Sequence, residues 1–199
     1  MMLVKVCGMR DADNIREVEA LGIDLMGFIF WPKSSRYVAE RPSYMPTRCK
    51  RVGVFVDETL TKVKETAKAY QLDFIQLHGK ESADYAAELC DYRLIKAFNI
   101  ATVDDFAACA PYEGKVDYFL FDTKGKCVGG NGEKFDWSVL KAYDGKTPFL
   151  LSGGIAPDDA ARVNAIHHPL FAGIDLNSRF ELCPALKDVS TLKEFIQAL

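Results

Sequence analysis

The chain has 199 residues, of which 49% are hydrophobic and 27% are charged, and its formal net charge is −3 at pH 7. These values are typical of a soluble globular domain, and they argue against nucleic acid as a partner because no basic surface is indicated. No apolar run approaches the roughly 18 residues of a membrane-spanning helix, so we expect no membrane partner. Six cysteines are scattered without a Cys-x-x-Cys pair, which argues against a zinc site and a disulfide framework and favours reduced thiols in a cytoplasmic protein.

Short apolar runs and amphipathic runs alternate along the whole chain. The apolar runs predict β-strands over residues 3–6, 24–30, 51–56, 73–77, 93–97, 118–121, 148–151 and 171–174. The amphipathic runs predict helices over residues 12–21, 60–70, 82–90, 102–109, 137–143, 157–165 and 191–198. Asp11 or Asp13 can cap the first of these helices, and Asp57 or Thr59 can cap the next.

The connection between the second and third predicted strands differs from the others. Residues 38–47 occupy a helix position, but they include Pro42 and Pro46. Because proline interrupts the helical hydrogen-bond ladder, any helix there must be short or distorted. A second irregular connection, residues 125–132, is rich in glycine and precedes the predicted helix at 137–143.

Eight strand-then-helix units predict an α/β fold in which residues 1–199 form a single (β/α)8 barrel domain. A doubly wound open sheet is the alternative. That fold usually has fewer strands and a Gly-x-Gly-x-x-Gly fingerprint after the first strand, where this chain instead has Cys7 and Gly8.

The carboxyl ends of the strands of such a barrel meet at one mouth, where ligands bind. The residues that follow the predicted strands include a thiol, several carboxylates, an arginine and two loops of small residues. They are Cys7, the loop with Arg36, Asp57, His78, Lys96, Asp122, the loop of Ser152, Gly153 and Gly154, and the run of Asp175, Leu176, Asn177 and Ser178. Taken alone, Cys7 is better explained as a buried core residue than as a functional thiol.

The two loops after the seventh and eighth strands predict a phosphate site. Gly153 and Gly154 let the backbone approach a ligand closely, and Asn177 and Ser178 add polar groups beside them. A plain glycine turn is the alternative explanation of Gly153 and Gly154.

Seven motifs, in their order along the chain, resemble those of the phosphoribosylanthranilate isomerase family of tryptophan biosynthesis. They are Val4-Lys5-Val6-Cys7-Gly8, Pro32-Lys33-Ser34-Ser35-Arg36, Gln76-Leu77-His78-Gly79, Asp122, Gly129-Gly130-Asn131-Gly132 before Phe135-Asp136-Trp137, Leu151-Ser152-Gly153-Gly154, and Asp175-Leu176-Asn177-Ser178. Two positions depart from the family pattern: Asn131 stands where threonine is more frequent, and Arg179 stands where a small residue is more frequent.

The resemblance implies an Amadori rearrangement of a small phosphorylated substrate with no cofactor and no metal. By similarity, Asp122 is the general acid and Cys7 is the general base, whose pKa neighbouring cations would lower. Arg36 is expected to bind the anthranilate carboxylate, because a planar guanidinium matches that group.

The remaining expectations are less specific. His78 is either a structural or an orienting residue, and Asp175 orients a substrate hydroxyl or braces its loop. Gly153, Gly154, Asn177 and Ser178 are expected to bind the phosphate. The chain is expected to be a monomer or a homodimer.

Two other functions fit a phosphate-binding barrel. One is another sugar-phosphate enzyme, such as indole-glycerol-phosphate synthase or a histidine-pathway isomerase. The synthase needs a catalytic lysine on an early strand, and Lys5 shares a strand face with Cys7. The other is a non-catalytic phosphate-binding domain, against which the presence of both Cys7 and Asp122 argues.

Overall fold

The computed structural model of the chain describes residues 2–123 and 136–199. The glycine-rich connection at 125–132 therefore lies outside the described residues. Within them, eight parallel strands form a closed barrel in which each strand pairs with the next and β8 pairs with β1. The strands are β1 Leu3–Cys7, β2 Leu25–Ile29, β3 Lys50–Phe55, β4 Phe74–Leu77, β5 Arg93–Asn99, β6 Tyr118–Asp122, β7 Phe149–Ser152 and β8 Phe171–Leu176. The predicted fold class is confirmed.

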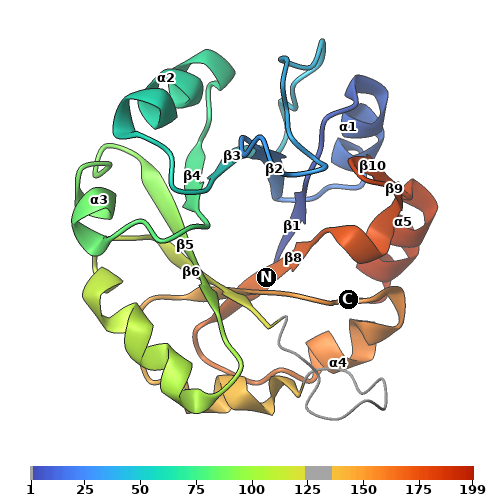
Figure 1. The fold of residues 1–199 in the computed structure, drawn as a ribbon. Helices are drawn as coiled ribbons and strands as arrows, with labels where there is room; N and C mark the ends of the chain where they lie inside the picture. Colours follow the sequence, from blue (N-terminus) through green and yellow to red (C-terminus); the bar gives the residue numbers. More distant parts are fainter. Residues whose placement is uncertain (1, 124–135) are drawn as a thin grey trace.

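The helices lie around the outside of these strands (Figure 1). The α-helices are α1 Ala12–Glu19, α2 Leu60–Tyr70, α3 Ala83–Ala87, α4 Ala160–Asn164 and α5 Val189–Gln197. The 3-10 helices are η1 Val103–Tyr112, η2 Trp137–Ala142, η3 Pro157–Asp159 and η4 Ser178–Phe180. Two segments predicted as ordinary helices, at 102–109 and 137–143, thus have 3-10 geometry instead.

Local capping chemistry explains where the helices begin. The Asp11 side chain accepts hydrogen bonds from the backbone N–H groups of Asp13 and Asn14 at 3.1 and 2.9 Å, so Asp11 is the cap of α1. Thr59, rather than Asp57, caps α2 by accepting from Lys62 N at 3.3 Å. Each cap is one of the two candidates that the sequence offered.

The connection from β2 to β3 contains no helix. Residues 38–49, all of which are described, form bends and irregular segments between an isolated bridge at Tyr37 and the start of β3. Pro42 and Pro46 account for this, because each removes a backbone donor and restricts the residue before it. The position that could hold only a short or distorted helix therefore holds none.

A two-stranded hairpin between β8 and α5 was not predicted. Its strands are β9 Glu181–Cys183 and β10 Leu186–Lys187, which pair antiparallel. The side chain of Asn14 in α1 bonds the backbone of Lys187 in both directions, at 3.0 and 2.8 Å, and so fixes the hairpin against the barrel. The hairpin thereby holds two charged side chains, those of Glu181 and Lys187, beside the carboxyl ends of the strands.

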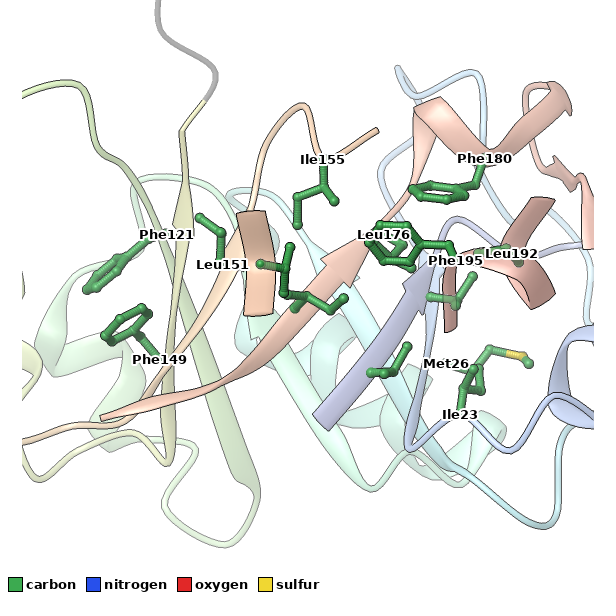
Figure 2. Packing of buried hydrophobic residues seen from close by; sticks show 14 of the residues in the cluster. Ile23, Met26, Phe121, Phe149, Leu151, Ile155, Leu176, Phe180, Leu192 and Phe195 are labelled. Atoms are coloured by element: carbon green, nitrogen blue, oxygen red, sulfur yellow. The ribbon is translucent and has the colours of Figure 1, made fainter. Parts of the chain in front are cut away.

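Apolar packing fills both sides of the sheet. Outside the barrel, Phe121 and Phe149 pack with ring centroids 4.8 Å apart, and Phe180 of η4 packs on Phe195 of α5 at 5.0 Å (Figure 2). Inside the barrel, side chains from six strands form one cluster: Leu25, Val52, Phe74, Ile95, Ala97, Leu120 and Leu150. This cluster fills the barrel interior below the strand ends, as is usual for the fold.

Candidate active site

A cavity of about 400 Å³ opens at the carboxyl ends of the barrel strands. All nine residues singled out from the sequence line it: Cys7, Arg36, His78, Asp122, Gly153, Gly154, Asp175, Asn177 and Ser178. The structure thus brings together residues from the ends of six strands or from the loops after them. Of the other strand-end residues considered, Ser152 also lines this cavity, whereas Asp57, Lys96 and Leu176 do not.

Cys7 is the last residue of β1, and two neighbouring glycines leave room for its side chain and for that of Arg36. A Cβ added at Gly27 would lie 2.6 Å from the Cys7 Sγ atom. Gly8 has φ of 81°, and a Cβ there would lie 2.6 Å from Arg36 Cδ. Only glycine leaves room at these two positions for the thiol and the guanidinium stem.

The charges around Cys7 oppose one another. Burial raises the pKa of the Cys7 thiol, the ammonium group of Lys5 lowers it, Asp175 raises it and Lys187 lowers it. The net direction is upward. Neighbouring cations therefore lower this pKa as expected, but the desolvation of the buried thiol outweighs them and leaves it above its usual value.

Lys5 and Asp175 form an ion pair in the barrel interior. They are partners in the β1–β8 register, with Nζ 2.9 Å from Oδ1, and both side chains are buried. Asp175 therefore has one oxygen occupied while it also lines the cavity. The same pairing holds the ammonium group of Lys5, which was the candidate lysine of the synthase alternative.

Asp122 ends β6 and lines the cavity that Cys7 reaches from β1. In the barrel order β7 and β8 separate the two strands, so the thiol and the carboxyl group enter the cavity from different sides. Asp122 also acts on His78, whose pKa it raises against the larger lowering effect of burial. The net pKa of His78 is lowered, so its imidazole is neutral near pH 7.

Gln76 is a cavity residue that the site prediction omitted. Its Nε2 atom lies 2.9 Å from His78 Nδ1, and its side chain is 1% exposed. Its Oε1 atom is buried and has no hydrogen-bond partner among the described residues. A signal was present, because Gln76 interrupts an apolar strand two residues before His78 and so shares its strand face.

The loops after β7 and β8 form the most open polar part of the cavity. Gly153 and Gly154 have φ of 89° and 71°, a conformation that favours glycine. Thr123 holds this loop by donating from its hydroxyl to the carbonyl oxygens of Ser152 and Gly153 at 3.0 and 3.2 Å. From the β8 side, Asn177, Ser178 and Arg179 line the same cavity.

Arg36 reaches the cavity from the loop after β2, but its guanidinium is already bonded to a carboxylate. Nε donates to the two oxygens of Glu181 at 2.8 and 3.0 Å, and Nη2 donates at 2.5 Å. These bonds raise the pKa of Arg36. Among the described residues, its Nη1 atom has no hydrogen-bond partner, so this edge is available to a ligand.

Glu181 and Lys187 were not predicted as site residues. Lys187 Nζ donates to Glu181 Oε1 at 2.6 Å and to Asn177 Oδ1 at 2.8 Å, and both side chains of the ion pair are at most 4% exposed. Hydrogen bonds from Arg36 and Lys187 lower the pKa of Glu181 against the effect of burial. No sequence signal placed these residues, because they follow the last barrel strand on a hairpin.

Three further observations concern the other cysteines, the helices and possible metal ligands. Besides Cys7, the described cysteines Cys49, Cys90, Cys109 and Cys183 are free thiols. No described helix combines the length and the apolar character needed to cross a membrane. In the described ranges, no three His, Cys, Asp or Glu side chains are grouped so that they could hold a metal ion.

Comparison with known proteins gives one consistent result. Residues 4–198 match the family model described as N-(5′-phosphoribosyl)anthranilate (PRA) isomerase. The chain is 51% identical over 206 residues to N-(5′-phosphoribosyl)anthranilate isomerase of Parabacteroides distasonis, covering 100% of this chain and 93% of that protein.

Solved structures agree with this match. Phosphoribosyl anthranilate isomerase of Thermotoga maritima superposes with a TM-score of 0.86 at 31% identity, covering 100% of this chain and 98% of that one. A phosphoribosyl anthranilate isomerase in complex with reduced 1-(o-carboxyphenylamino)-1-deoxyribulose 5-phosphate superposes with a TM-score of 0.84 at 29% identity, with the same coverage.

Proposed function

Because the chain belongs to the family of N-(5′-phosphoribosyl)anthranilate isomerases, we propose that Cys7 is the general base of its reaction and Asp122 the general acid. The chain is an isomerase of tryptophan biosynthesis. It converts N-(5′-phosphoribosyl)anthranilate into 1-(2-carboxyphenylamino)-1-deoxyribulose 5-phosphate. Two of the proton transfers in this conversion, protonation of the ring oxygen and removal of the C2 proton, are each assigned to one of these residues.

One observation carries the assignment: Cys7, Asp122 and the loops after β7 and β8 line a single cavity of about 400 Å³. The rearrangement needs an acid and a base on different sides of one sugar, together with a site for the phosphate. Cys7 on β1 and Asp122 on β6 meet the first requirement. Gly153 and Ser178 lie where barrels commonly bind phosphate.

The first step opens the ribose ring. Asp122 gives its proton to the furanose oxygen, the bond from that oxygen to C1 breaks, and the anthranilate nitrogen supplies the electron pair for a C1–N double bond. The product is a protonated Schiff base with a free hydroxyl at C4. The carboxylate left on Asp122 is close enough to influence the charge of His78.

The second step moves a proton from carbon to sulfur. The Cys7 thiolate removes the C2 proton, and the electrons of the C2–H bond neutralise the iminium nitrogen through the new C1–C2 double bond. The resulting enolamine becomes the product ketone when the C2 hydroxyl loses its proton and C1 gains one. The ammonium groups of Lys5 and Lys187 favour the thiolate that this step requires.

Three groups orient the substrate. The backbone at Gly153 and Gly154, with Asn177 and Ser178, binds the phosphate. The free edge of Arg36 binds the anthranilate carboxylate, although Glu181 holds the other edge. His78, neutral and bonded to Gln76, offers a hydrogen bond beside Asp122.

The test is a fluorescence assay that follows the consumption of freshly made N-(5′-phosphoribosyl)anthranilate without added metal or cofactor. Cys7→Ala and Asp122→Asn should each reduce kcat by about 10² or more. The controls are Cys90→Ala and Asp91→Asn, which change residues outside the cavity. Full activity in either site variant would overturn its assigned role.

We also propose that residues 1–199 act as one domain, in the cytoplasm, and as a monomer or a homodimer. The closed barrel formed by the described residues supports the first part. The free thiols support a reducing compartment. Analytical ultracentrifugation at micromolar concentration distinguishes the monomer from the dimer.

A further inference from the structure

A second buried ion pair lies at the edge of the cavity, next to the thiol. The side chains of Glu181 and Lys187 are 4% and 0% exposed, and Glu181 bonds both Lys187 and Arg36. Burial of two charges is unfavourable unless they are well paired, and a well-packed apolar pair is often at least as stable. The hairpin β9–β10 that carries them contributes no strand to the barrel.

The ammonium group of Lys187 lies close to the strand end that carries the thiol. Lys187 Nζ is 2.8 Å from Asn177 Oδ1. A Cβ built on Gly8 would be 2.9 Å from that same oxygen atom. Lys187 is therefore near the backbone of Gly8, the residue that follows Cys7, and its charge acts on the thiol.

Charges of both signs surround Cys7. Three cations and two carboxylates act on the thiol or are paired with the groups that do, namely Lys5, Lys187, Arg36, Asp175 and Glu181. Lys5 and Lys187 lower the pKa of the thiol and so favour the thiolate, although burial raises this pKa by more.

We propose that Lys187 is a positioning residue that stabilises the Cys7 thiolate, and that Glu181 holds both Lys187 and Arg36 in place for this purpose. The proposal rests on the assignment of Cys7 as the general base. Lys5, which is paired with Asp175 on the neighbouring strand, lowers the pKa of the same thiol from within the barrel. Lys187 is the cation that the hairpin supplies.

The thiolate itself can be measured without the reaction. Thiolate absorbance at about 240 nm is recorded against pH for each protein, and the curve of the same protein carrying Cys7→Ser is subtracted. Lys187→Met should move the Cys7 midpoint upward by about one pH unit or more, which is roughly a tenfold change in the ionisation constant. Lys187→Arg, which keeps the positive charge, should leave the midpoint close to that of the unmodified protein.

A second variant is needed because Lys187→Met alone leaves the buried Glu181 without this cation and could misfold. Glu181→Gln combined with Lys187→Met removes both charges of the pair, which is better tolerated than an unpaired buried carboxylate. It should also raise the midpoint. The matched control is Glu81→Gln with Lys96→Met, which removes another buried pair, 3.1 Å apart, that does not line the cavity; this control should leave the midpoint unchanged.

The activity measurements separate this proposal from the one it rests on. If it is correct, the acidic limb of the kcat/KM profile moves upward with the Cys7 midpoint in Lys187→Met. A midpoint that does not move in Lys187→Met or in the double variant would sink the proposal, whatever the activity. Full activity of Cys7→Ala would instead overturn the role of the base and leave the absorbance result intact.

Discussion

Lys5 and Asp175 are partners across the β1–β8 seam, 170 residues apart in sequence, and their ion pair of 2.9 Å lies inside the closed barrel. The seam is where the first and last barrel strands meet. The pair therefore connects the closure of the fold to the active site, because Asp175 lines the cavity and Lys5 acts on Cys7. Removing either partner should affect both stability and chemistry.

Lys5→Met should destabilise the protein by about 3–5 kcal/mol, because it leaves the buried Asp175 carboxylate without its cation. Urea unfolding followed by circular dichroism measures this. Arg16→Ala is the control, since its pair with Asp13 is exposed (51% and 90%) and should contribute less than about 1 kcal/mol. A loss no larger than that of the control would mean that the seam pair is not needed for stability.

Gly27→Ala should impair catalysis through the thiol. The added methyl group would lie 2.6 Å from Cys7 Sγ, so the sulfur must move, and kcat should fall by about tenfold or more because alignment is lost. Gly53→Ala is a matched comparison on the next strand, where the methyl group would meet Leu72 and Phe55 instead. Steady-state kinetics and unfolding on both variants distinguish them. Equal kcat losses at equal destabilisation would contradict a specific effect on Cys7.

Gln76→Leu should reduce kcat/KM without a matching loss of stability. The buried Oε1 atom has no partner among the described residues, so its removal relieves an unsatisfied acceptor while it deprives the substrate of a hydrogen bond. We expect about a tenfold loss in kcat/KM, and a change in unfolding free energy smaller than about 1 kcal/mol. Unchanged kinetics would contradict a role of this amide in substrate binding.

His78 should make stability depend on pH below 6.5. Burial lowers its pKa in the folded chain from the ordinary value of 6.5, so below that pH the unfolded chain binds more protons than the folded one. The unfolding free energy should therefore fall as the pH decreases from 6.5, and His78→Asn should flatten this fall. Urea unfolding at several pH values tests it. Above a pH of about 7 the two proteins should have parallel profiles, and parallel profiles in the acidic range as well would contradict the assignment.

Much of the barrel could be predicted from local pattern. The order of strands and helices follows from apolar periodicity. Asp11 and Thr59 cap α1 and α2, and Pro157 begins η3, so each marks a helix start through local chemistry. The segment at 38–47 shows where periodicity stops being informative, since its two prolines leave no helix at a helix position. The hairpin was missed because its strands span only residues 181–183 and 186–187, too short for a periodic signal.

Within the site, too, some features follow from the local sequence and others depend on the folded chain. Parallel strands place their carboxyl ends at one rim, and therefore a residue's position after a strand was enough to assign Cys7, His78 and Asp122 to one cavity. The pairing of the charges, by contrast, could be learned only from the folded chain, because Arg36 meets Glu181 across 145 residues and Lys5 meets Asp175 across 170. Such contacts depend on barrel closure and on side-chain direction, and no local spacing in the chain encodes either of them.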